Sequence, residues 1–181
     1  MKKIIVIVTS MFLLAACGNS STNTETQSSV ESSTSSSVEG KALTLVHGKN
    51  TTQAGEVVQY VEDLLEKNPN LGAENAISLN YADATNSDGT TTYALFLVTN
   101  RTADRIEQNF DFTVNWSYDG TVIYENQKVL YEPDEYGVLE PNTTAIIFLP
   151  LPAESVDVVK NMTDNSKISL SISDLAYVED Y

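Results

Sequence analysis

Residues 109–120 read NFDFTVNWSYDG and decide the fold. Large apolar side chains occupy every second position of this stretch, and polar side chains lie between them. The apolar set is Phe110, Phe112, Val114, Trp116 and Tyr118. A period of two predicts a β-strand with one buried face. Asp119-Gly120 follows, which is the strongest short signal for a hairpin turn, so we expect 121–131 (TVIYENQKVLY) to return as the antiparallel partner.

Further strands are predicted on both sides of this hairpin. Alternation marks 76–82 (AISLNYA) and 167–173 (KISLSIS), which 175–178 (LAYV) extends, whereas 92–99 (TYALFLVT) and 145–151 (AIIFLPL) are continuous apolar runs. A continuous run is typical of a central strand that is buried on both faces. About seven strands in succession, without alternating helices, predict a mainly β fold: an antiparallel immunoglobulin-like β-sandwich.

One helix is expected before the strands, over residues 54–67. Its apolar side chains recur at helical spacing, while acidic side chains occupy the other side. Thr51 or Thr52 can cap its start, and Asn68-Pro69 ends it. We expect this helix to pack on its own domain, covering an open edge or one end of the sandwich.

The first 16 residues have the pattern of a secretory signal peptide. Lys2 and Lys3 precede a short apolar run from Ile4 to Leu14, and two alanines follow. The run is shorter than the roughly 20 residues of a transmembrane helix.

Leu14-Ala15-Ala16-Cys17 resembles the lipobox of bacterial lipoproteins. The resemblance implies cleavage after Ala16 and attachment of fatty acyl chains (a diacylglyceryl group) to Cys17, the only cysteine. Two acyl chains suffice for stable anchoring. The lipobox resemblance also implies that this lipid anchors the protein to the outer face of the cytoplasmic membrane. A free thiol, an intermolecular disulfide and a metal ligand are the alternative roles of Cys17.

Residues 17–40 are expected to form the lipidated cysteine and a disordered tether. Residues 18–40 are almost all Ser, Thr, Asn, Gln, Gly and Glu, which cannot bury enough apolar area to fold. Such Ser/Thr-rich tethers resemble those of Gram-positive cell-surface lipoproteins. The folded domain is expected over 41–181.

Part of that domain resembles the immunoglobulin-like domains of unknown function in Gram-positive lipoproteins. The resemblance rests on 93–123 (YALFLVTNRTADRIEQNFDFTVNWSYDGTVI) and 139–152 (LEPNTTAIIFLPLP). The shared pattern is a buried strand ending in Thr-Asn, a strand ending near Asp-Gly, and a Leu-x-Pro-Asn turn before an apolar strand. The resemblance implies a fold and a surface location, but no reaction and no functional residues.

The charge excludes some classes of partner. The chain has 25 acidic and 10 basic residues, and 41–181 alone has 22 and 8, which gives −14. A nucleic-acid partner is therefore not expected, and a protein partner, if electrostatically bound, would be basic.

The sequence contains no complete motif of a serine hydrolase or of an EF-hand. His47 is the only histidine, and no Gly-x-Ser-x-Gly sequence occurs. The stretch 83–89 (DATNSDG) fails as an EF-hand because Ala84 and Leu95 occupy ligand positions. We interpret 85–91 (TNSDGTT) as a polar turn between strands, and we expect no metal or cofactor. A candidate acidic interaction surface, for a cation or a basic partner, lies in EPDEYGVLE. It consists of Glu132, Asp134, Glu135 and Glu140.

We therefore expect a non-enzymatic binding or interaction module, such as an immunity or accessory protein for a secreted partner. The alternative is a cell-envelope hydrolase that uses paired carboxylates.

Overall fold

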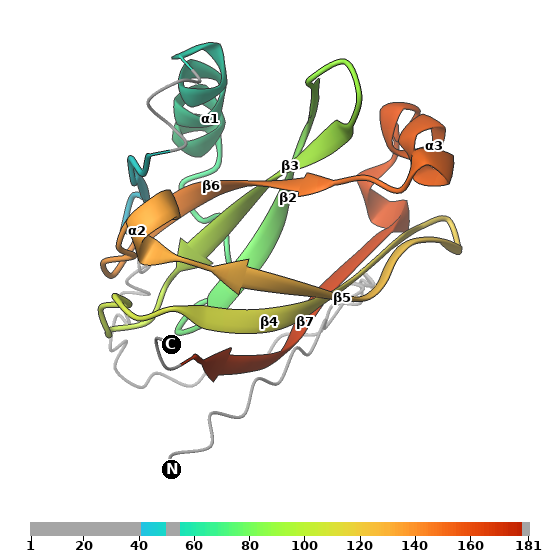
Figure 1. Cartoon of the computed structure of the whole chain (residues 1–181). Helices are drawn as coiled ribbons and strands as arrows, with labels where there is room; N and C mark the ends of the chain where they lie inside the picture. The colour runs from blue at the N-terminus through green and yellow to red at the C-terminus, as the bar shows by residue number, and fades with distance from the viewer. Residues whose placement is uncertain (1–40, 50–54, 179–181) are drawn as a thin grey trace, which may run out of the picture. The chain divides into compact units, whose positions relative to one another are not determined.

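The computed structural model describes residues 41–49 and 55–178, and the compact unit to which they belong spans Gly40–Tyr181. Two sheets stack on each other (Figure 1). The first, in the order β1-β6-β3-β2, contains β1 (Thr44–Leu45), β6 (Thr143–Pro150), β3 (Thr92–Asn100) and β2 (Ile77–Ser87). The second, in the order β5-β4-β7, contains β5 (Thr121–Tyr131), β4 (Phe110–Tyr118) and β7 (Ile168–Tyr177). The prediction of a mainly β sandwich is confirmed.

The strand order is that of an immunoglobulin-like domain. If β2 to β7 take the letters A, B, C, C′, E and F, the sheets become A-B-E and C′-C-F. The described residues after β7 form no strand that would correspond to G. All the pairings between these strands are antiparallel; only the two-residue β1 runs parallel to β6.

The β4–β5 hairpin forms as predicted. Tyr118 pairs with Thr121, so Asp119 and Gly120 make a two-residue turn, and both have positive φ, 48° and 79°. These signs belong to a type I′ turn, whose twist matches that of the flanking strands.

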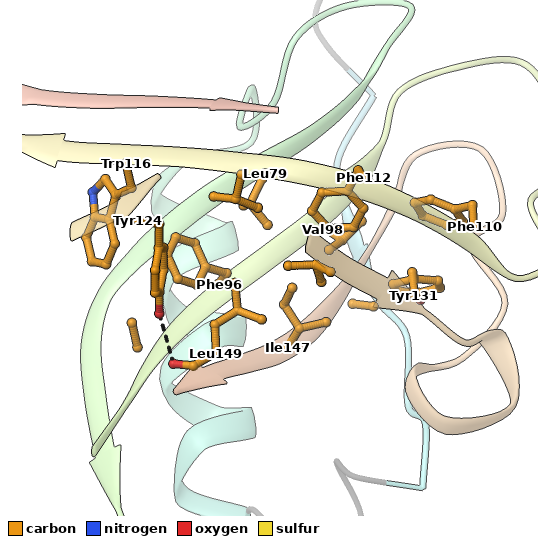
Figure 2. Packing of buried hydrophobic residues seen from close by; sticks show 14 of the residues in the cluster. Leu79, Phe96, Val98, Phe110, Phe112, Trp116, Tyr124, Tyr131, Ile147 and Leu149 are labelled. Carbon is orange, nitrogen blue, oxygen red and sulfur yellow. Dashed lines mark hydrogen bonds between the residues drawn. The ribbon is translucent and has the colours of Figure 1, made fainter. Parts of the chain in front are cut away.

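Aromatic side chains fill one half of the core between the sheets. Trp116 of β4 lies against Tyr81, Phe96 and Tyr124, with ring centroids 4.9 to 5.6 Å apart (Figure 2). The Tyr124 hydroxyl donates to the Leu149 carbonyl at 3.2 Å and so avoids being buried without a partner. The predicted apolar face of 109–118 is thus the core face of β4.

A helix, α1 (Gly55–Lys67), covers the outer face of the first sheet. Its Val61 and Leu65 pack in a second apolar cluster with Leu95 and Leu97 of β3 and Ile146 of β6. The expected position, at an edge or an end, is therefore wrong. Position 54 and the proposed caps Thr51 and Thr52 lie outside the described residues.

Short helical segments complete the loops. They are α2 (Pro133–Tyr136), η2 (Ala153–Ser155), α3 (Val156–Lys160) and η3 (Asn165–Lys167). The sequence patterns above do not predict them, because each is shorter than two helical turns. Val159 of α3 joins the core at one end of the sandwich.

The Thr-Asn end of β3 forms hydrogen bonds with β6 and with the loops at the other end of the sandwich. Thr99 and Thr144, both buried, share a hydrogen bond of 3.0 Å between their hydroxyls. The fully buried Asn100 side-chain amide donates to the Leu139 carbonyl at 2.9 Å and to the Asp104 carbonyl at 2.8 Å. Its Oδ1 accepts from the Thr102 N–H at 2.9 Å. The Thr-Asn pattern at the end of β3 therefore has a structural role, because its side chains hydrogen-bond to neighbouring segments.

Candidate interaction surface

The predicted acidic surface is built on α2. This single turn begins at Pro133, whose ring is buried. Just after the turn, the Gly137 carbonyl accepts a hydrogen bond of 2.6 Å from the Tyr131 hydroxyl. The segment from β1 passes so close that a Cβ at Gly48 would collide with the Glu135 carbonyl oxygen. Glu132, Asp134 and Glu135 thus lie around Pro133 in this turn, whereas Glu140 lies after it, before β6.

Two of the four carboxylates are in ion pairs. Lys49 lies 2.8 Å from Glu135, and Arg105 lies 3.1 Å from Glu140. The hydrogen bond and the charge of Glu135 raise the pKa of Lys49 above its usual value, and Asp134 and Glu132 add to this effect. The acidic side chains thus do not form one uncompensated patch, and a role in binding a basic partner stays a prediction.

The described residues contain no group of three or more His, Cys, Asp or Glu side chains that could hold a metal ion. His47 is exposed, and among those residues no hydrogen bond joins it to a hydroxyl or a carboxylate. A turn follows β2 where one was predicted, but it is shorter than 85–91, because Thr85 to Ser87 belong to β2 and Ser87 pairs with Thr92.

Asp88 stabilises that turn. Its Oδ1 accepts from the backbone N–H groups of Thr90 and Thr91, both at 2.8 Å, and its Oδ2 accepts from the Tyr93 hydroxyl. These bonds, led by the one from Thr91, lower the pKa of Asp88 below its usual value.

Asp88→Asn is expected to make the stability of the protein less dependent on pH. A lowered folded-state pKa contributes stability that is present above the unfolded pKa, about 4, and is lost as the pH falls through the folded value. The difference in melting temperature between wild type and variant should therefore shrink from pH 7 to pH 3. Asp134→Asn, which removes a carboxylate outside this turn, is the control. A difference that stays constant with pH would contradict the assignment.

The outer face of the second sheet has no helix over it in the described part of the chain (Figure 1). Strand register places its side chains in rows across β5, β4 and β7. The rows are Val122–Ser117–Ser169, Lys128–Thr113–Ser173 and Leu130–Asp111–Ala176. Val122 is 57% exposed and Leu130 is 43% exposed, and the side chains around them are mostly small and polar. This face is mostly polar, and its two exposed large apolar side chains both lie on β5, although Thr113 in its middle row is buried.

Sequence reasoning did not identify this face as a site. The signal was present: serines alternate with Ile and Leu in 167–173, which gives β7 an outer row of small hydroxyl groups. By itself this alternation predicts a strand and does not indicate that its polar face is a binding surface.

Shallow hollows occur on the surface of the described residues. One, of about 180 Å³, lies at the Val122 end of β5 and is lined by outer-face side chains such as Ser117, Val122 and Ser169 and by the core residues Trp116 and Tyr124. Another, of about 140 Å³, lies between α1 and the first sheet and is lined mainly by apolar side chains, with Glu56 at its rim. Each contains a single carboxylate, so neither supplies the acid pair that a glycosidase needs.

The predicted cleavage and lipidation positions, Ala16 and Cys17, lie outside the described residues, as do the signal peptide and the tether. Within residues 41–49 and 55–178, no helix has the length and apolarity to cross a membrane. Comparisons of the chain with protein-family models, with curated proteins and with solved structures find no match.

Proposed function

We propose that the protein is a lipoprotein that is anchored by its lipid to the outer face of the cytoplasmic membrane, and that its sandwich acts as a binding module rather than as a catalyst. The observation that carries this proposal is the difference between the two sheets. The outer face of one is buried under α1, whereas the outer face of the other is uncovered and has exposed apolar side chains at Val122 and Leu130. Single exposed apolar side chains are common on protein surfaces, so the proposal rests on the uncovered sheet face as a whole, on which Val122 and Leu130 are the exposed apolar side chains.

The lipobox resemblance supports the anchor. Lipid on Cys17 would hold the chain at the membrane, and 18–40 would give the domain a reach of about 26 Å as a flexible coil. Such a tether raises the effective concentration of the domain near partners at the same surface. Because the domain has a charge of −14, we expect the partner to be basic where it meets exposed carboxylates.

Cys17→Ala tests the anchor. Wild type is expected in the membrane fraction and to incorporate labelled palmitate, whereas the variant is expected to lose the label. Retention of the label by Cys17→Ala would refute the proposed lipid site. The host should be one that processes bacterial lipoproteins.

The binding face is tested by affinity capture of envelope proteins at low and at high salt. Val122→Asp combined with Leu130→Asp should abolish capture, because it places two charges at the apolar contact points. Thr90→Asp combined with Thr163→Asp adds the same charge at other exposed positions and should leave capture intact. If both pairs behave alike, the outer face is not the site. Hydrolysis of wall polymer that is lost when either of two neighbouring carboxylates is replaced would instead support the hydrolase.

A further inference from the structure

Strand β7 leaves part of the core accessible at the edge of the second sheet. Ile168, Leu170 and Ile172 point into the sandwich but are only half-buried. The corresponding side chains of its neighbour β4, such as Val114 and Trp116, are at most 1% exposed. The core is therefore shielded from solvent at β4 but only partly shielded at β7, because the described residues add no further strand beyond β7.

The free edge of β7 offers regular backbone groups. The Asp119 N–H donates to the Lys167 carbonyl, so by antiparallel alternation Ser169, Ser171 and Ser173 bond to β4. The N–H and C=O groups of Leu170 and Ile172 then point away from the sheet, as does the C=O of Ile168. The Ile168 N–H already donates to Asn165 within η3.

This edge also lacks the usual protection. Soluble proteins block long edge strands with charges, proline or bulges. Residues 168–173 (ISLSIS) contain no charge and no proline, and the register is regular from Ile168 to Ser173. The first irregularity is at Asp174, whose φ is 53°.

The geometry points to a second copy of this chain as the occupant of the edge, paired β7 to β7 in antiparallel orientation about a two-fold axis through Leu170. In this register Leu170 faces Leu170, Ile168 faces Ile172 and Ser169 faces Ser171 of the other copy. The Leu170 N–H bonds to the Leu170 C=O across the axis, and the Ile172 N–H bonds to the Ile168 C=O. Apolar side chains meet apolar ones, serines meet serines, and the outward backbone groups are those that pair.

Charges at the two ends of β7 favour the same orientation. Lys167 precedes the uncharged segment and Asp174 follows it, so an antiparallel pair brings Lys167 of one copy beside Ser173 and Asp174 of the other. An axis shifted to Ser171 would instead place Ile168 opposite Asp174, which is unfavourable. The register centred on Leu170 is therefore favoured over the one centred on Ser171.

The resulting sheet would be continuous across both copies. An edge-to-edge contact of one strand is smaller than the roughly 1,000 Å² that a permanent interface needs, so the dimer is expected to be weak and concentration-dependent. It requires neither the lipid nor a partner protein, so its test is independent of the proposed function.

The test is sedimentation velocity of the full chain in mild detergent, from about 10 µM to about 1 mM, a range that covers weak association. Ser169→Lys with Ser171→Lys places lysine opposite lysine twice and should weaken the dimer by roughly tenfold or more. Ser169→Lys with Ser171→Glu alters the same exposed positions but places lysine opposite glutamate, and it should dimerise at least as well as wild type. Circular dichroism confirms that both variants fold.

Amide hydrogen exchange identifies the strand. Protection of the Leu170 and Ile172 N–H groups should rise with concentration in wild type and in the lysine–glutamate variant, but not in the double-lysine variant. A chain that stays monomeric at about 1 mM would overturn the inference. So would a dimer that tolerates both lysines, or one that both variants disrupt equally.

Discussion

Trp116→Ala is expected to lower the free energy of unfolding by about 4 kcal/mol, the largest effect of any single change considered for this protein. Trp116 is 1% exposed and belongs to the core cluster between the sheets. Alanine would remove the ring that Tyr81, Phe96 and Tyr124 contact from three different strands. Since these neighbours come from both sheets, they cannot all move in to fill the space, and a cavity remains.

Trp116→Phe is the matched control, with an expected cost of about 1–2 kcal/mol. The Trp116 indole nitrogen is the only buried side-chain nitrogen or oxygen among the described residues that lacks a hydrogen-bond partner. Its removal therefore sacrifices no hydrogen bond, and phenylalanine keeps most of the aromatic contact.

Urea unfolding followed by far-ultraviolet circular dichroism measures both variants, because the only tryptophan of the chain cannot serve as a fluorescent probe once replaced. If alanine costs no more than phenylalanine, the aromatic cluster does not hold the sheets together in the way described.

The position of α1 shows where sequence reasoning stopped short. The run 92–99 was correctly predicted to be buried on both faces, and Leu95 and Leu97 do lie on the side opposite Phe96 and Val98. A sandwich buries only one face of each sheet, so something else had to cover Leu95 and Leu97. The predicted helix over 54–67 is the element that can cover them, so the apolar run and the helix together indicate that the helix packs on this face.

The acidic surface shows a different limit. Counting charges identifies Glu135 and Glu140 but cannot find their partners. Lys49 is 86 residues from Glu135 in sequence, and it lies near because the segment after β1 packs against α2. Charge compensation between distant segments depends on topology, which the local pattern does not encode.

The Thr-Asn pattern enters the sequence analysis through a resemblance, but the chemistry of asparagine also indicates a structural role for it. Asparagine is uncommon in the interior of a strand, and at the end of a buried one its amide can bond to several loop carbonyls. The structure has this arrangement: the Asn142 N–H also donates to the Asn100 carbonyl, at 2.8 Å. One residue thus joins the loop after β3 to the turn before β6.

Asn100→Ala is the second large prediction, with an expected loss of about 3 kcal/mol in the free energy of unfolding. The change removes the donors to Leu139 and Asp104 and the acceptor of the Thr102 N–H. The Asn100 side chain and its bond to Leu139 are buried, whereas the bonds with Asp104 and Thr102 are partly buried. Buried groups left without partners cost more than the net value of the lost bonds. Asn80→Ala is the control, since the Asn80 amide is only half-buried and its bonds, at 3.3 and 3.4 Å, are long; its cost should stay below about 1 kcal/mol.

Asn100→Asp separates lost donors from lost volume. The acid keeps the acceptor for Thr102 and nearly the same shape, but when ionised it turns a negative oxygen toward the carbonyls of Leu139 and Asp104. Repulsion and burial then raise its folded-state pKa, so the variant is least stable at neutral pH and regains stability relative to wild type as the pH falls and the acid becomes a donor. Urea unfolding of Asn100→Asp and wild type at pH 7 and pH 4 measures this. A deficit that does not shrink at pH 4 would mean that Asn100 fills space in the loops rather than joining them through its amide donors.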